Sequence, residues 1–188
     1  AMWLMCEKIS QITDDKVFFS GEGADELFIG YVYFHYAPSP EEAAVEAKRL
    51  IDEMYMYDVL RADRSVSSHG LELRVPFLDR DFVNLILNLP DESRVPIDGA
   101  EKHLLREAFS DGWLPDVVLN RRKNGMSDGV SGDSGKLWFE HIEEHVATLG
   151  LTENEWYKQL LGEHFSVYKA NEKLLTSSCF YIKYSIYI

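Results

Sequence analysis

The chain has 188 residues, of which 46% are hydrophobic, and this length and composition fit one globular domain with a sizeable core. Its 19 basic and 32 acidic residues give a formal net charge of −13, which argues against nucleic acid and anionic membranes as partners, because both bind basic surfaces. No apolar run in the sequence approaches the roughly 18 residues of a membrane-spanning helix.

The first residues predict an amphipathic helix, because Met5, Ile9 and Ile12 fall at helical spacing, and the early charges Glu7 and Lys8 do not fit a secretory signal. A chain that opens within a helix leads us to expect further sequence upstream. The 2 cysteines, Cys6 and Cys179, lie near opposite ends and show no zinc-binding spacing. We therefore predict neither a zinc site nor a disulfide, and a reducing, cytoplasmic location.

Residues 16–26 (KVFFSGEGADE) combine a short apolar run with a turn that contains two glycines. The run predicts a buried strand, and the residues after the glycines predict the start of a helix. A ligand can approach the main chain closely at glycine, and amides at a helix start favour anionic oxygens. Glu22, Asp25 and Glu26 repel a bare phosphate, so the turn indicates a nucleotide that arrives with a divalent cation or meets a basic partner. An ordinary turn stays the alternative for so short a motif.

A second helix is predicted to begin at Pro40, with Ser39 as its N-cap, and to run to about residue 60. From there to residue 79, charged residues alternate irregularly with small residues, so the helix is not expected to continue well. Pro76 argues against a simple central strand in this stretch, since proline cannot donate to a sheet. The apolar, aromatic residues 27–34 are expected in the core.

The remaining elements are expected to be mostly helical. Asp79 is the predicted N-cap of a helix that ends before Pro90. Residues 126–135 are rich in Gly, Ser and Asp and predict a loop, and residues 177–188 alternate polar with apolar side chains and predict a strand. Further helices are predicted at residues 101–109, 114–122, 136–149 and 153–162.

Two basic residues, Lys102 and Lys123, are candidates to supply positive charge at the acidic glycine turn. Each has an ordinary interpretation, Lys102 as part of a surface helix with i,i+4 pairs and Lys123 as a charge at a helix C-terminus. If either lysine folded back over Glu22 and Asp25, it would stabilise phosphate oxygens and the charge that develops in adenylyl transfer. The residues alone leave both interpretations open.

Several motifs, in this order, together resemble the synthetase domain of glutamine-hydrolysing asparagine synthetases. They are SGEGADE at residues 20–26, RVPFLD at 74–79, EKH at 101–103, and RRK at 121–123 followed by SDG at 127–129. The resemblance makes residues 1–188 a partial synthetase domain, well matched over about 1–130, with 131–188 a divergent helical tail. It implies the α/β class, as the mostly helical C-terminal portion of an adenine nucleotide alpha hydrolase-like (PP-loop ATP pyrophosphatase) domain with one edge strand of the parallel sheet.

The resemblance implies a ligase that uses ATP and Mg²⁺. In that reaction ATP activates the side-chain carboxylate of aspartate as β-aspartyl-AMP with release of pyrophosphate, and ammonia then displaces AMP to give asparagine. Ammonia would come from glutamine through a cysteine amidohydrolase domain that these residues do not contain. The resemblance is also compatible with a homodimer of the full-length enzyme.

The resemblance also implies the site residues. Glu22 would have two roles, to contact the nucleotide and to accept a proton from the attacking ammonia. Asp25 would hold Mg²⁺ on pyrophosphate. Lys102 and Lys123 would be the catalytic lysines, which offset charge on the α-phosphate and the leaving pyrophosphate. The residues expected at the nucleotide are Ser20, Gly21, Glu22 and Gly23.

The chain also departs from the family pattern. It contains no pyrophosphate loop of the type Ser-Gly-Gly-x-Asp-Ser, and Ile29 and Met126 stand where the family usually has glycine and phenylalanine. We therefore expect a fragment or a degenerate member that is inactive as a synthetase on its own. The alternatives are a β-lactam synthetase-like enzyme, in which an internal amine replaces ammonia, and a non-catalytic nucleotide-binding module.

Overall fold

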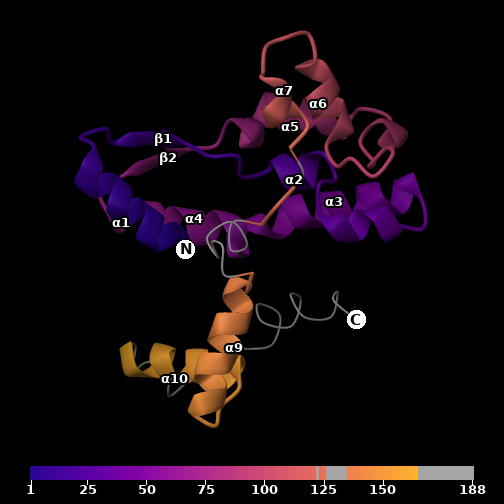
Figure 1. The fold of residues 1–188 in the computed structure, drawn as a ribbon. Helices are drawn as coiled ribbons and strands as arrows, with labels where there is room; N and C mark the ends of the chain where they lie inside the picture. Colours follow the sequence, from indigo (N-terminus) through magenta and orange to yellow (C-terminus); the bar gives the residue numbers. More distant parts are fainter. Residues whose placement is uncertain (122, 126–134, 165–188) are drawn as a thin grey trace. The chain divides into compact units, whose positions relative to one another are not determined.

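The structure, a computed structural model, describes residues 1–121, 123–125 and 135–164 (Figure 1). It divides into two compact units, Met2–Lys123 and a unit that contains the residues from Asn124 onward. The predicted strand at 177–188, and all of the predicted loop at 126–135 except its last residue, lie outside the described residues. In chain order the elements are α1 (Met2–Ile12), β1 (Val17–Phe19), α2 (Ala24–Leu27), η1 (Val32–Tyr36), α3 (Pro40–Glu53), η2 (Met54–Met56), α4 (Asp58–Ser67), β2 (Glu72–Arg74), η3 (Pro76–Leu78), α5 (Arg80–Leu87), η4 (Asp91–Ser93), α6 (His103–Ala108), α7 (Asp116–Leu119), α9 (Trp138–Thr148) and α10 (Glu153–His164).

The sheet of the Met2–Lys123 unit consists of β1 and β2, which pair in parallel with Phe18 opposite Leu73. Phe18 and Leu73 pack against α1 and α4, which Figure 1 shows along one side of the two strands. Phe19, on the opposite face of β1, is 77% exposed. The mostly helical α/β class with a parallel sheet is therefore confirmed. The expectation of only one strand of the parallel sheet was wrong, because β2 is a second strand. The predicted burial of β1 was also wrong in part, because one of its faces is open.

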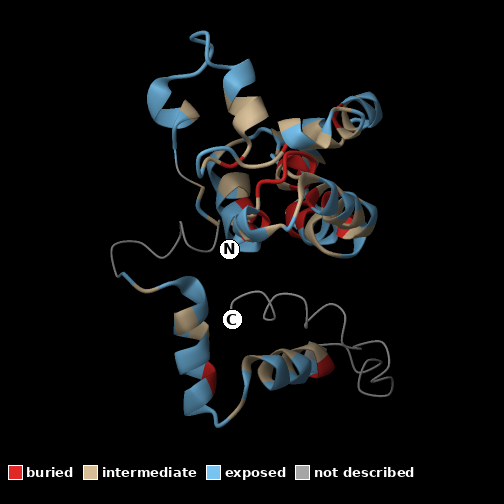
Figure 2. Ribbon diagram, turned by 90° about the vertical axis from the view of Figure 1, so that its right-hand side faces the viewer, coloured by how far each residue is buried: buried red, intermediate tan, exposed pale blue. Residues whose placement is uncertain are grey.

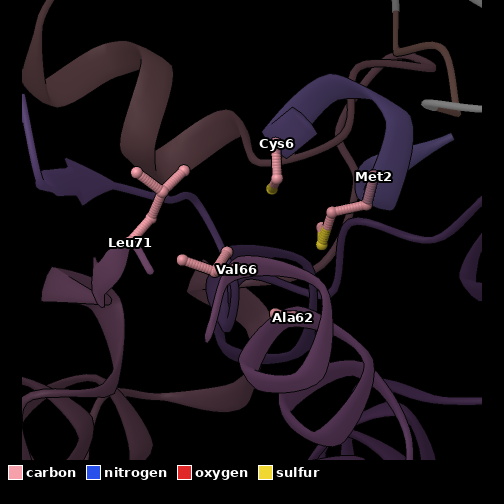
Figure 3. Packing of buried hydrophobic residues seen from close by; sticks show 5 residues of the cluster. All are labelled: Met2, Cys6, Ala62, Val66 and Leu71. Carbon is pink, nitrogen blue, oxygen red and sulfur yellow. The ribbon is translucent and has the colours of Figure 1, made fainter. Parts of the chain in front are cut away.

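The first hydrophobic cluster joins α1 to α4 (Figure 3). The N-terminal helix is confirmed, but its predicted apolar face is confirmed only in part: Ile9 packs against this cluster, whereas Met5 is 45% and Ile12 is 68% exposed. The small residue Ala62 lets the two helices approach closely. The buried members of this cluster are Met2, Cys6, Ala62, Val66 and Leu71.

The predicted start of α3 is confirmed, because the Glu42 N–H donates to Ser39 Oγ at 3.2 Å and Pro40 occupies the first turn. Its predicted length was wrong: α3 ends at Glu53, and the backbone turns at Tyr57 with φ −123° and ψ −93°. A separate helix, α4, then continues to Ser67, so the expectation that helix would continue poorly was wrong for the first part of the stretch and is confirmed after α4 ends. Its buried face is a narrow stripe of small and β-branched residues: Ala62, Ser65 and Val66.

A second cluster surrounds α2 and α5, and Figure 2 shows the buried segments of this unit gathered between its helices. Leu27 is fully buried and Phe28 is 2% exposed, with the Phe28 ring centroid 6.2 Å from those of Phe77 and Phe82. The cap of α5 is confirmed, since Asp79 Oδ1 accepts from the N–H of Phe82 at 3.1 Å. This packing anchors the start of α2, where the candidate site lies.

In the second unit, α9 and α10 contact each other and confirm the helices predicted at 136–149 and 153–162. The His145 ring lies edge-on to Trp156, with 5.2 Å between the ring centroids. In the first unit, α6 and α7 are shorter than the helices predicted at 101–109 and 114–122. Within the described ranges, no helix has the length and apolar character needed to cross a membrane.

Candidate active site

The glycine loop, residues 20–23, is fixed between β2 and η3. The Ser20 N–H donates to the last carbonyl of β2 at 2.9 Å, and the Glu22 N–H donates to Ser20 Oγ at 3.4 Å. Gly23 has φ 92°, and a Cβ built there would lie 2.4 Å from Leu78 Cδ2, so this position requires glycine. A Cβ built at Gly21 would meet nothing within 4 Å. The main chain at Gly21 is therefore open to a ligand, and α2 begins directly after the loop, as predicted.

Both predicted lysines fold back onto α2. The Asp25 Oδ1 atom lies 3.0 Å from Lys102 Nζ and 2.7 Å from Lys123 Nζ. The three side chains, which we call the lysine cluster, are 24%, 21% and 19% exposed in the order Asp25, Lys102, Lys123. Lys123 Nζ also lies 5.2 Å from the centroid of the Tyr31 ring, a cation–π distance. The ordinary surface interpretations of the two lysines do not hold.

The lysine cluster depends on an unusual backbone conformation at Lys102 and on the lack of a side chain at Gly30. Lys102 has φ 56°, in the left-handed region that disfavours residues other than glycine. A Cβ built at Gly30 would lie 2.4 Å from Asp25 Oδ1 and 2.6 Å from Lys102 Cε. Glycine at position 30 thus leaves the space in which Asp25 and Lys102 meet. Strained positions of this kind cluster at functional sites.

Ile29, which departs from the family pattern, has both an unfavourable backbone conformation and a buried side chain. Its φ is 51°, a conformation that favours glycine and strains a β-branched residue. Its side chain is nevertheless fully buried and packs with Phe34 and Ala43. The family's usual glycine suits the backbone here, whereas isoleucine offsets the strain by burying its whole side chain.

Glu22 contacts a cation that the sequence analysis did not select. Arg61 Nη2 of α4 lies 3.5 Å from Glu22 Oε1, and Arg61 Nη1 lies 2.7 Å from Asp58 Oδ1. Burial raises the pKa of Glu22, and the Arg61 charge lowers it in part. Glu22 borders a surface hollow of about 440 Å³ that Val66 and Leu73 also line. The i,i+3 spacing of Asp58 and Arg61 predicts their own ion pair, but the sequence has no pattern that predicts the contact of Arg61 with Glu22.

Glu26 is 3% exposed and accepts a hydrogen bond from the Tyr31 hydroxyl. Burial raises the pKa of the Glu26 carboxyl; the Tyr31 bond lowers it, and the Asp58 and Asp25 charges raise it further. Burial and the Glu26 charge together also raise the pKa of Tyr31. The buried surroundings of the Glu26 carboxyl thus disfavour its ionised form.

Glu26→Gln is therefore expected to stabilise the protein at pH 7, because glutamine keeps an acceptor for Tyr31 and carries no buried charge. The folded state takes up the Glu26 proton at higher pH than the unfolded state, so the stability gap between variant and wild type should close as pH falls through the raised pKa. Urea denaturation at pH 7, 6 and 5 measures the gap. Glu92→Gln, at an exposed carboxyl, is the matched control, and a gap that widens toward low pH would contradict the expectation.

Asp25 was the predicted Mg²⁺ ligand, and its Oδ1 faces two ammonium groups, which repel a further cation. Within residues 1–121, 123–125 and 135–164, no group of three or more His, Cys, Asp or Glu side chains could hold a metal ion. These residues by themselves do not fit a protein-held magnesium site. Asp25 as a metal ligand stays a prediction.

A family comparison accounts for most of the chain. The model of the asparagine synthase family matches residues 1–52 and 39–180. The chain belongs to the asparagine synthase family. The resemblance of its motifs is thereby confirmed, and the two matches include Asp25 in the first and both lysines of the cluster in the second.

Three curated relatives of the chain each bear the name "Asparagine synthetase [glutamine-hydrolyzing]". The protein from Gallus gallus is 52% identical over 146 residues, and those from Rattus norvegicus and Homo sapiens are 53% identical over 146 residues. Each match covers 77% of this chain and 26% of the relative. The chain thus spans about a quarter of the length of these relatives.

Proposed function

We propose that this chain supplies part of the ATP site of an enzyme that makes asparagine from aspartate and ammonia. The family and the name of its relatives support the reaction class. In this proposal residues 1–188 belong to one synthetase domain of the PP-loop ATP pyrophosphatase type. ATP, Mg²⁺, glutamine as the source of ammonia, a cytoplasmic location and a homodimer of the whole enzyme are parts of the proposal that come with the family.

The convergence of Lys102 and Lys123 on Asp25 carries this proposal. Lys123 and Asp25 are 98 positions apart in sequence, yet their side chains are hydrogen-bonded directly beyond the open glycine loop. Two ammonium groups held at one point suit a ligand with several anionic oxygens.

Each site residue has a role in the proposed reaction. The main chain of the glycine loop binds the nucleotide next to the start of α2. Lys102 and Lys123 stabilise the charge on the α-phosphate and on pyrophosphate as the bond between them breaks and the aspartate carboxylate bonds to phosphorus. Ammonia then bonds to the acyl carbon and the bond to AMP breaks. Glu22 accepts the proton that ammonia loses, a role that its raised pKa favours.

The proposal is tested by titrating the chain with ATP in a calorimeter, with and without Mg²⁺. Lys102→Met and Lys123→Met are each expected to weaken ATP binding about tenfold or more, because each removes a charge-assisted hydrogen bond. Lys48→Met is the control, since Lys48 is an exposed lysine of α3 that pairs with Asp52. Binding that is absent in the wild-type chain, or equal in all variants, would count against the ATP site.

The reaction itself needs a separate measurement on the whole enzyme, namely pyrophosphate exchange into ATP that depends on a carboxylate. Exchange that requires aspartate supports an asparagine synthetase. Exchange that requires a different carboxylate, one with an internal amine, supports the β-lactam synthetase-like alternative. ATP binding without exchange supports a non-catalytic nucleotide-binding module.

A further inference from the structure

Arg106 of α6 joins the two segments that carry the lysines. Its Nε donates to the Glu101 carbonyl at 2.8 Å, its Nη1 donates to the Leu119 carbonyl, and its Nη2 donates to the Arg121 carbonyl at 2.9 Å. One guanidinium group therefore holds the main chain on both sides of the gap between α6 and α7. The guanidinium is planar and has five donors in a fixed fork, so it can set the relative position of several carbonyls.

The carbonyls that Arg106 binds lie next to the lysines in sequence. Glu101 directly precedes Lys102, and Arg121 lies two positions before Lys123. Leu119 is the last residue of α7, where a helix leaves carbonyls without an intrahelical partner. The contacts of Arg106 thus fix the points from which both lysine side chains extend.

The main-chain bonds of α7 do not provide this connection, because they run within α7 itself. The Asn120 N–H donates to the Asp116 carbonyl at 2.9 Å, and the Leu119 N–H donates to the Pro115 carbonyl at 3.0 Å. The separation of α7 from α6 is instead bridged by the Arg106 side chain.

We propose that Arg106 is a positioning residue, which holds the main chain next to Lys102 and Lys123 so that both ammonium groups meet at Asp25 and can act on one anionic ligand. The importance of this placement for catalysis rests on the proposed function. The placement itself rests on the contacts of Arg106 with Glu101, Leu119 and Arg121. Arg106 acts through the lysines, so its loss should change what they do before it changes the fold.

The placement is tested without any nucleotide, by brief acylation of the chain with acetic anhydride and mass spectrometry of each lysine. In Arg106→Gln the acylation rate of Lys123 is expected to rise about tenfold, because the lost charge-assisted hydrogen bonds release its main chain. Lys48 of the same molecule is the internal reference. Arg106→Lys should give a similar rise, since one ammonium group cannot span three carbonyls, and full protection in this variant would overturn the proposal.

Two control variants separate positioning from general loosening. Arg64→Gln removes an exposed guanidinium of α4 that lies 3.9 Å from Asp63. Ile86→Val lowers the stability of the core without touching a carbonyl that Arg106 binds. Both should leave the Lys123 rate unchanged. A rise in Ile86→Val equal to that in Arg106→Gln, or no rise in an Arg106 variant that folds by circular dichroism, would overturn the proposal; if Arg106→Gln does not fold, Arg106→Lys decides.

A second readout connects the placement to ligand binding. If Arg106 acts through Lys123, the losses of ATP affinity in Arg106→Gln and Lys123→Met should not add in the double variant. Fully additive losses would overturn the positioning role. A chain that protects Lys123 from acylation and yet binds no ATP would overturn the proposed function, but not the role of Arg106.

Discussion

Gly30→Ala is expected to separate Lys102 from Asp25 and to lower the stability of the protein by about 1 kcal/mol or less, because the atoms that crowd the new methyl group belong to the ends of flexible side chains, so that mainly one ion pair is lost. The new Cβ would lie 2.4 Å from Asp25 Oδ1 and 2.6 Å from Lys102 Cε, so at least one of the two side chains must move. Urea denaturation measures the loss of stability. The acylation rate of Lys102 should rise with it.

The matched control for this variant is Gly21→Ala. A Cβ at Gly21 meets nothing within 4 Å, and Gly21 is not among the glycines with positive φ, so its stability should stay within about 0.5 kcal/mol of the wild type. Equal stability and equal Lys102 acylation in Gly30→Ala and wild type would show that the space beside Gly30 is not needed.

Phe28→Ala is expected to destabilise the protein by about 3–5 kcal/mol, because a buried aromatic side chain leaves a cavity when it is truncated. Phe28 is 2% exposed and its ring contacts those of Phe77 and Phe82. Urea denaturation measures this effect. Tyr36→Ala is the control, since Tyr36 is 84% exposed and its removal should cost less than about 0.5 kcal/mol. A cost at Phe28 as small as that at Tyr36 would contradict the packing between α2 and α5.

Local signals in the sequence predicted the helix starts well. Ser39 and Asp79 act as caps because a side-chain oxygen next to free N–H groups needs nothing from the rest of the chain. The glycine turn and the short helix after it followed from the same kind of local chemistry.

Non-local pairing could not be predicted in the same way. β2 has three residues, stands two positions before Pro76, and forms only because β1, far away in sequence, supplies its partner. The charged helix α4 was missed because its apolar stripe is narrow and becomes buried only when α1 covers it.

The candidate site shows the same division. The sequence named both lysines and Asp25, but spacing alone left open whether they meet. That depends on the left-handed backbone at Lys102, on the space beside Gly30 and on the main-chain contacts of Arg106, none of which has a pattern in the sequence. Arg61 and Arg106 were not predicted as site residues, because an arginine on a helix surface usually faces solvent and forms at most a weak ion pair.

Within the lysine cluster itself, the two ammonium groups outnumber the one carboxylate of Asp25. Residues 1–188 carry a formal charge of −13, so their long-range field repels a polyanion. Attraction at the lysine cluster acts only over short distances, within a screening length of about 8 Å at physiological salt. If the proposed ATP site is correct, a polyanionic ligand would be repelled by most of the surface and attracted only near the lysine cluster, so the place of binding would be selective and the rate of encounter low.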